Sequence, residues 1–87
     1  MPIVKILLVE DEPELASYIV RCLSEHGHSV DHAARGDTGY ALASEGSYDL
    51  LVVDRMLPGM DGLLLVKALR ENRSKVPVLF LMIVLFV

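Results

Sequence analysis

The chain has 87 residues, of which 53% are hydrophobic, so we expect residues 1–87 to form one small domain with a substantial core. The net charge of −4 and the lack of a basic stripe argue against direct contact of these residues with nucleic acid. Cys22 is the single cysteine, which excludes an internal disulfide, and no signal peptide or membrane-spanning stretch is found, so we expect a cytoplasmic location and no membrane partner.

Short apolar runs alternate with amphipathic stretches along the chain. The first run predicts a buried strand over residues 3–9, and the next stretch predicts a helix from Pro13 to a C-cap at Gly27. Residues 28–34 predict a weaker strand near the sheet edge, followed by a helix that Asp37 caps. Three histidines in this part of the chain raise the alternative of a metal site, but without a fixed ligand spacing solvated edge histidines are favoured.

The second half of the chain continues the alternation. Residues 50–53 form an apolar run that predicts a strand buried on both faces, and this run stops at Asp54. Pro58 and Gly59 then indicate a turn. A third helix is predicted over residues 62–71 and a last strand from Val78 to at least Met82. Strands that alternate with helices in this way predict an α/β three-layer sandwich with a parallel sheet.

Acidic residues follow two of the predicted strands at their carboxyl ends, where open parallel sheets bind their ligands. The first strand leads into Glu10 and Asp11, and the third ends at Asp54, for which a turn or cap role would be favoured if it were considered alone. If these strands are neighbours, three carboxylates converge and repel one another. A hard cation such as Mg²⁺ would relieve this repulsion, and a carboxylate beside it can attack phosphorus to form an acyl phosphate.

Three segments carry a resemblance to a known family: residues 6–12 (ILLVEDE), 49–54 (DLLVVD) and 56–62 (MLPGMDG). Over residues 3–81 the chain resembles the receiver domain of bacterial two-component response regulators, and it is most similar to the OmpR/PhoB type. Members of that type usually carry a C-terminal winged-helix DNA-binding domain and regulate transcription. The resemblance implies a flavodoxin-like fold with strand order 2-1-3-4 and no enzymatic turnover beyond Mg²⁺-dependent self-phosphorylation.

The resemblance also assigns roles to individual residues. It implies that Asp54 is the phosphoacceptor, which takes phosphate from a sensor histidine kinase. It implies that Glu10 and Asp11 form the acidic pair, with Asp11 a direct Mg²⁺ ligand beside Asp54. Met56 would contribute its backbone carbonyl to the metal.

The chain also departs from the family pattern. Where the family has Ser or Thr at the end of the fourth strand, this sequence has Met82, which cannot donate a hydrogen bond. The fifth strand with its lysine, and the last helices, are missing, so the alternative is a truncated fragment that does not switch. An aspartate-based phosphatase is disfavoured, because Met56 stands where such enzymes place a second aspartate.

The C-terminal segment predicts self-association. Residues 78–87 are all apolar, with no charge, proline or glycine, although natural edge strands are usually blunted by such residues. With the order 2-1-3-4 the fourth strand is an edge, and its free N–H and C=O groups can pair with another strand. We therefore expect a homodimer or higher oligomer that forms through this strand or through exchange of residues 82–87.

Overall fold

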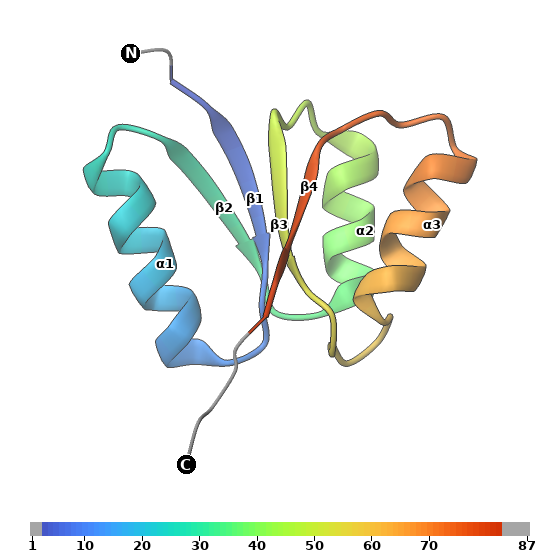
Figure 1. Cartoon of the computed structure of the whole chain (residues 1–87), viewed down its shortest axis with the longest axis horizontal. Helices are drawn as coiled ribbons and strands as arrows, with labels where there is room; N and C mark the ends of the chain where they lie inside the picture. The colour runs from blue at the N-terminus through green and yellow to red at the C-terminus, as the bar shows by residue number, and fades with distance from the viewer. Residues whose placement is uncertain (1–2, 83–87) are drawn as a thin grey trace.

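The computed structural model describes residues 3–82 of the chain. Strands and helices alternate in the following order: β1 (Lys5–Val9), α1 (Pro13–Glu25), β2 (Ser29–Ala33), α2 (Gly36–Glu45), β3 (Leu50–Asp54), α3 (Gly62–Glu71) and β4 (Val78–Leu81). The strands form one parallel sheet in the order β2-β1-β3-β4, as predicted. The helix α1 covers one face of this sheet, and α2 and α3 cover the other (Figure 1).

The core consists of two layers because successive side chains of a strand point to opposite faces. On the α1 side, Ile6, Leu8 and Val52 pack against Ala16. On the other side, the strand residues Leu7, Val9, Leu51 and Val53 pack against Leu65 and Leu69 of α3. The central strands β1 and β3 are thus buried on both faces, which explains why their sequences are continuous apolar runs.

The first helix begins at Pro13 as predicted, but its C-cap is His26, one residue before the predicted Gly27. The side chain of Glu12 caps it by accepting hydrogen bonds from the backbone N–H groups of Glu14 and Leu15, and Pro13 occupies the first helical position. Beyond the C-cap residue His26, Gly27 has a φ of +86° and reverses the chain direction.

The second helix corrects one prediction, because Asp37 is not its cap. The N-cap is Arg35, whose side chain makes no capping bond, and α2 begins at Gly36. Asp37 lies in the first turn, where its carboxylate accepts from the Thr38 N–H and pairs with the Arg35 guanidinium at 3.0 Å. The helix starts before Asp37 because the Gly36 N–H finds a partner outside the helix, the carbonyl of Pro58.

The three histidines have separate partners rather than one shared site. The ring Nδ1 of His28 accepts from the Val4 N–H, His32 is bonded to the carbonyl of Glu10, and His26 is bonded to the carbonyl of Cys22. Within residues 3–82, no group of three potential metal ligands includes a histidine. His32 alone lies in the edge strand β2, while His26 is the C-cap of α1 and His28 precedes the strand.

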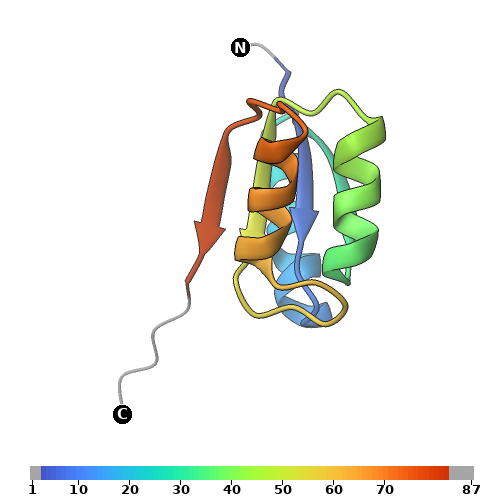
Figure 2. The ribbon, with the colours of Figure 1, turned by 90° about the vertical axis from the view of Figure 1, so that its right-hand side faces the viewer.

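The strand β4 lies at one edge of the sheet, beside β3 and on the side away from α2 (Figure 2). It ends at Leu81, one residue earlier than predicted, and Met82 is not part of it. Leu79 is 58% exposed and Phe80 36%, so this edge carries apolar surface. The predicted association through residues 83–87 concerns a segment outside the described residues.

Candidate functional site

The acidic residues predicted to converge do so. Glu10 and Asp11 follow β1, and Asp54 ends β3, the strand that pairs directly with β1. One carboxylate oxygen from each of the three residues lies within 4.8 Å of the others. We call Glu10, Asp11 and Asp54 the acidic cluster. The parallel register brings these residues together, because Val9 and Val53 are paired one position before the acids begin.

Glu10 is the buried member of the cluster, with 2% of its surface exposed. Its carboxylate accepts a hydrogen bond from the Glu12 N–H at 2.9 Å, and its own N–H donates to the carbonyl of Ala33. The carbonyl of Glu10 lies 2.8 Å from Nε2 of His32, so the ring nitrogen donates there. Side chain and backbone of Glu10 are therefore fixed by neighbouring segments.

The surroundings of Glu10 raise the pKa of its carboxyl group. Burial is the largest cause, the hydrogen bond from Glu12 opposes it, and the negative charge of Asp54 and contacts with Asp11 raise the pKa further. A carboxyl group in this position holds its proton at higher pH than usual. A cation bound at the cluster would favour the ionised form, so binding and deprotonation of Glu10 are coupled.

Asp54 is half-buried at the start of the β3–α3 loop, which comprises residues 55–61. Its Oδ1 accepts a hydrogen bond from the Met56 N–H at 3.2 Å, which turns the carboxylate toward the loop. The carbonyl of Arg55 accepts from the Gly62 N–H at 2.9 Å, and Asp61 caps α3 through the Leu63 N–H. The loop is thus tied to the end of β3 and to the start of α3. The contribution of the Met56 carbonyl to a metal stays a prediction.

A hollow of about 310 Å³ opens beside the cluster. Its lining comprises Glu10, Asp54, Arg55, Met56, Leu81 and Met82. Met82 therefore lies beside the acids, as expected for the residue after the fourth strand. The exposed basic residue Arg55 also lines this hollow, a feature that the sequence interpretation missed although Arg55 directly follows Asp54. The contact of His32 with Glu10 was also missed, because 22 residues separate the two and no local pattern joins them.

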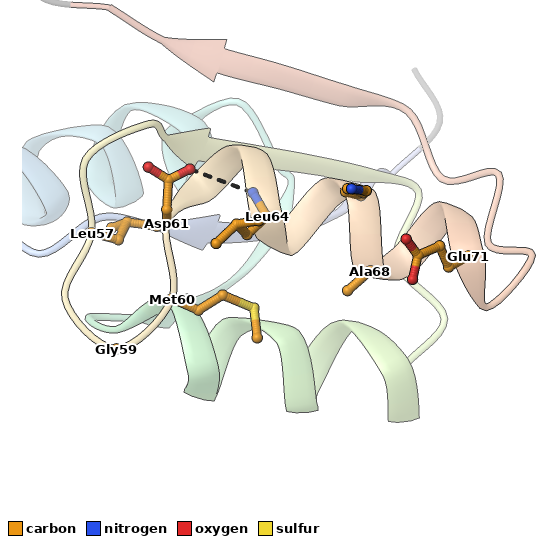
Figure 3. Close-up of a pocket in the computed structure, with 8 residues that line it drawn as sticks. Leu57, Gly59, Met60, Asp61, Leu64, Ala68 and Glu71 are labelled. Atoms are coloured by element: carbon orange, nitrogen blue, oxygen red, sulfur yellow. Dashed lines mark hydrogen bonds between the residues drawn. The ribbon is translucent and has the colours of Figure 1, made fainter.

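A second hollow, of about 600 Å³, lies along α3 and the loop before it (Figure 3). Its lining comprises Leu57, Gly59, Met60, Asp61, Leu64, Lys67, Ala68 and Glu71. No member of the acidic cluster lines it. The larger hollow is therefore separate from the place where the carboxylates converge.

The donor set of the acidic cluster fits a magnesium ion. All side-chain donors are carboxylate oxygens, without nitrogen or sulfur, and hard divalent cations prefer such ligands. The spacing of at most 4.8 Å allows the three oxygens to face one ion. Asp11 is exposed and Asp54 half-buried, so water and a phosphate oxygen could complete the coordination.

Among residues 3–82, no helix is long and apolar enough to cross a membrane.

The parallel order β2-β1-β3-β4 and the acids at the carboxyl ends of β1 and β3 define an α/β domain of the flavodoxin-like receiver type. Comparison with protein families makes this specific, because the family described as "Response regulator receiver domain" matches residues 6–83. The chain belongs to the response regulator receiver domain family.

The transcriptional regulatory protein TcrA of Mycobacterium tuberculosis is 46% identical over 78 residues, 90% of this chain and 31% of TcrA. The transcriptional regulatory protein CusR of Escherichia coli is 43% identical over 77 residues, 88% of this chain and 34% of CusR. The chain thus spans about a third of the length of these curated relatives.

Solved structures agree with the fold. The receiver domain of the Francisella response regulator 1452 superposes with a TM-score of 0.86 at 31% identity, over 88% of this chain and 64% of that one. The chemotaxis response regulator CheY4 of Vibrio cholerae gives a TM-score of 0.84 at 28% identity, over 91% of this chain and 68% of that one.

Proposed function

We propose that residues 1–87 form a phosphoacceptor domain of a two-component response regulator, which takes a phosphoryl group from a sensor histidine kinase onto Asp54. Mg²⁺ is the cofactor, held by Glu10, Asp11, Asp54 and the backbone carbonyl of Met56. The observation that carries this proposal is the convergence of three carboxylates within 4.8 Å at the ends of two paired central strands.

In the proposed reaction an oxygen of the Asp54 carboxylate attacks the phosphorus of the donor. A P–O bond forms to Asp54 while the bond from phosphorus to the kinase histidine nitrogen breaks, and that nitrogen keeps the electron pair. The Met56 N–H orients Asp54 through Oδ1, and Arg55 brings positive charge to the hollow that the phosphoryl group would enter. The metal, when bound, neutralises charge on the transferring group. The domain is thereby modified itself and performs no multiple-turnover catalysis.

For the whole protein we propose regulation of transcription in the cytoplasm, with DNA contacted by other parts of the protein. The support is that TcrA and CusR are transcriptional regulatory proteins and that this chain corresponds to about a third of each. The negative net charge of the chain agrees with a domain that does not touch nucleic acid itself.

A second candidate is a domain that keeps the acidic cluster but does not switch, and that self-associates through β4. Two observations favour it: Met82 lies in the hollow where a hydroxyl donor is expected, and Leu79 and Phe80 expose apolar surface on an edge strand. A homodimer that pairs two β4 strands would cover this edge.

Incubation with acetyl phosphate and Mg²⁺, followed by intact-mass measurement, separates the two candidates. Rapid and stoichiometric gain of one phosphoryl group supports the phosphoacceptor switch, whereas slow or incomplete labelling supports the second candidate. The control is Asp54→Asn, which keeps the shape of the side chain. Labelling of this variant to the wild-type extent would contradict the assignment of Asp54.

A further inference from the structure

The start of α2 and the β3–α3 loop are in contact although they are distant in the sequence. The backbone N–H of Gly36, the first residue of α2, donates a hydrogen bond of 2.9 Å to the carbonyl of Pro58 in the β3–α3 loop. In Figure 3 this loop curves past the start of α2, with Gly59 at the bend and the side chain of Met60 directed toward α2. The β3–α3 loop thus rests on the beginning of a helix from the other half of the chain.

The contact leaves no room for a side chain at Gly36. A Cβ atom there would lie 1.7 Å from the carbonyl oxygen of Met60, which is a backbone atom and cannot rotate away. The loop would have to retreat by more than 1 Å, because real Cβ contacts below 3.0 Å are essentially never seen. Gly36 is itself buried.

The second point of contact is Gly59, whose φ of +82° favours glycine. A Cβ on Gly59 would meet the carboxylate of Asp37 at 2.5 Å and the guanidinium of Arg35 at 2.7 Å. These two side chains form the exposed ion pair beside the helix start. They are the mobile ends of side chains, so this contact can adjust, whereas the one at Gly36 cannot.

The same loop reaches the acidic cluster at its other end. Met56 lies two residues before Pro58 and holds Oδ1 of Asp54 through its N–H. The two ends of the loop are joined by a hydrogen bond, because the Arg55 carbonyl accepts from the Gly62 N–H. A displacement forced at Met60 is therefore passed to Asp54 and Met56 through a short and tethered piece of backbone.

We propose that Gly36 is a positioning residue of the acidic cluster. Because it has no side chain, the β3–α3 loop can pack close to α2, and this position of the loop directs Met56 and Asp54 toward Glu10 and Asp11. This proposal rests on the proposed Mg²⁺ site and extends it to a residue of α2. Gly36 touches neither the metal nor the phosphoryl group and acts only through the backbone of the loop.

The test compares Gly36→Ala with Gly39→Ala. Gly39 is buried in the same helix, and the three atoms nearest to a Cβ there belong to the side chains of Val9, at 2.8 Å, and Leu65, which lie outside the loop. Both variants should lose stability, so a purely structural role predicts the same behaviour for both. We expect only Gly36→Ala to weaken Mg²⁺ binding, by about 10-fold or more, the usual effect of disturbing groups that hold metal ligands.

The measurement is an NMR titration with Mg²⁺, in which folding is read from the amide spectrum of each variant. The metal-free spectra add a readout that needs no ligand: the Asp54 and Met56 amide signals should shift in Gly36→Ala and stay in place in Gly39→Ala. Gly59→Ala is the milder second variant, with a smaller loss of Mg²⁺ affinity expected, and it replaces Gly36→Ala if that protein does not fold.

A folded Gly36→Ala protein with wild-type affinity and unmoved Asp54 and Met56 signals would overturn the proposal. Failure of both loop variants to fold would also overturn it, since the contact would then serve the fold rather than the site. A wild type that does not bind Mg²⁺ contradicts the proposed function instead, while the metal-free shifts still test whether Gly36 sets the loop.

Discussion

The buried carboxylate of Glu10 leads to a prediction about stability: Glu10→Gln should stabilise the metal-free protein at pH 7. Two charges 4.8 Å apart repel by about 3 kcal/mol at an effective dielectric constant of about 20. The oxygens of Glu10 and Asp54 lie within that distance. Asp54 is only half-buried, so water and salt reduce this figure, and we expect a net gain of about 1–2 kcal/mol.

The pH dependence follows from the direction of the pKa shift. The pKa of Glu10 is raised in the folded protein, chiefly by burial, so its protonated form suits the folded state. The contribution of Glu10 to the free energy of unfolding is therefore most favourable below the pKa that this group has in the unfolded chain. This contribution is lost as the pH rises through the pKa of the folded protein. The advantage of Glu10→Gln should be present at pH 7, should decrease once the pH falls below the raised pKa of the folded protein, and should be gone below the ordinary pKa of the unfolded chain.

Urea unfolding with a chelator present, followed by circular dichroism at several pH values, measures this effect. The control is Glu45→Gln, an exposed acid at the end of α2, which we expect to change stability by less than about 0.5 kcal/mol. Mg²⁺ should reverse the order, because it stabilises the wild type and binds the glutamine variant less well. A metal-free Glu10→Gln protein that is no more stable than the wild type at pH 7 would refute the reasoning.

Three further predictions concern the metal site, the edge strand and the core. Asp11→Ala should weaken Mg²⁺ binding strongly in a calorimetric titration, and an unchanged affinity would remove Asp11 from the ligand set. If the wild type self-associates, Leu79→Lys should shift it toward monomer in sedimentation experiments, whereas Tyr18→Lys, at an exposed position of α1, should not. A specific dimer would form at tens of micromolar, so a wild type that is monomeric at this concentration contradicts the expectation. Leu69→Ala, at a position 1% exposed, should lower the free energy of unfolding by about 2–5 kcal/mol in urea experiments. Leu64→Ala, at an exposed position of the same helix, should lower it by less than about 1 kcal/mol, and similar losses in both variants would show that α3 is packed differently.

Local patterns in the sequence were sufficient for the central part of the fold. The apolar runs before Glu10 and Asp54 predicted β1 and β3, because they are short, rich in residues that favour strands and end abruptly at charged residues. The acids at their ends then predicted the cluster, since parallel strands bring their carboxyl ends to one edge. The resemblance to receiver domains supplied the strand order that made β1 and β3 neighbours.

The errors and omissions arise where a partner distant in the sequence decides the local structure. Asp37 is a residue type that often caps helices, but α2 starts earlier because the Gly36 N–H donates to the carbonyl of Pro58, 22 residues away. A cap preference is worth about 1 kcal/mol and is readily outweighed by such a contact. The lack of space at Gly36 also depends on Met60, so no window of sequence around Gly36 contains the signal.

The placement of the acids on β1 and β3 has a consequence for hydrogen exchange. Both strands are flanked by a neighbour on each side, whereas β2 and β4 have a neighbour on one side only among residues 3–82. Amides of the inner ladder should exchange only when the whole domain unfolds, and those of the edge strands through smaller openings. Detachment of β4 would then remove Leu81 from the wall of the hollow while Glu10 and Asp54 keep their separation. Asp54 and the end of β1, which leads into Glu10, should therefore exchange slowly, whereas Leu81 in the wall of the hollow lies on an edge strand that should open more easily.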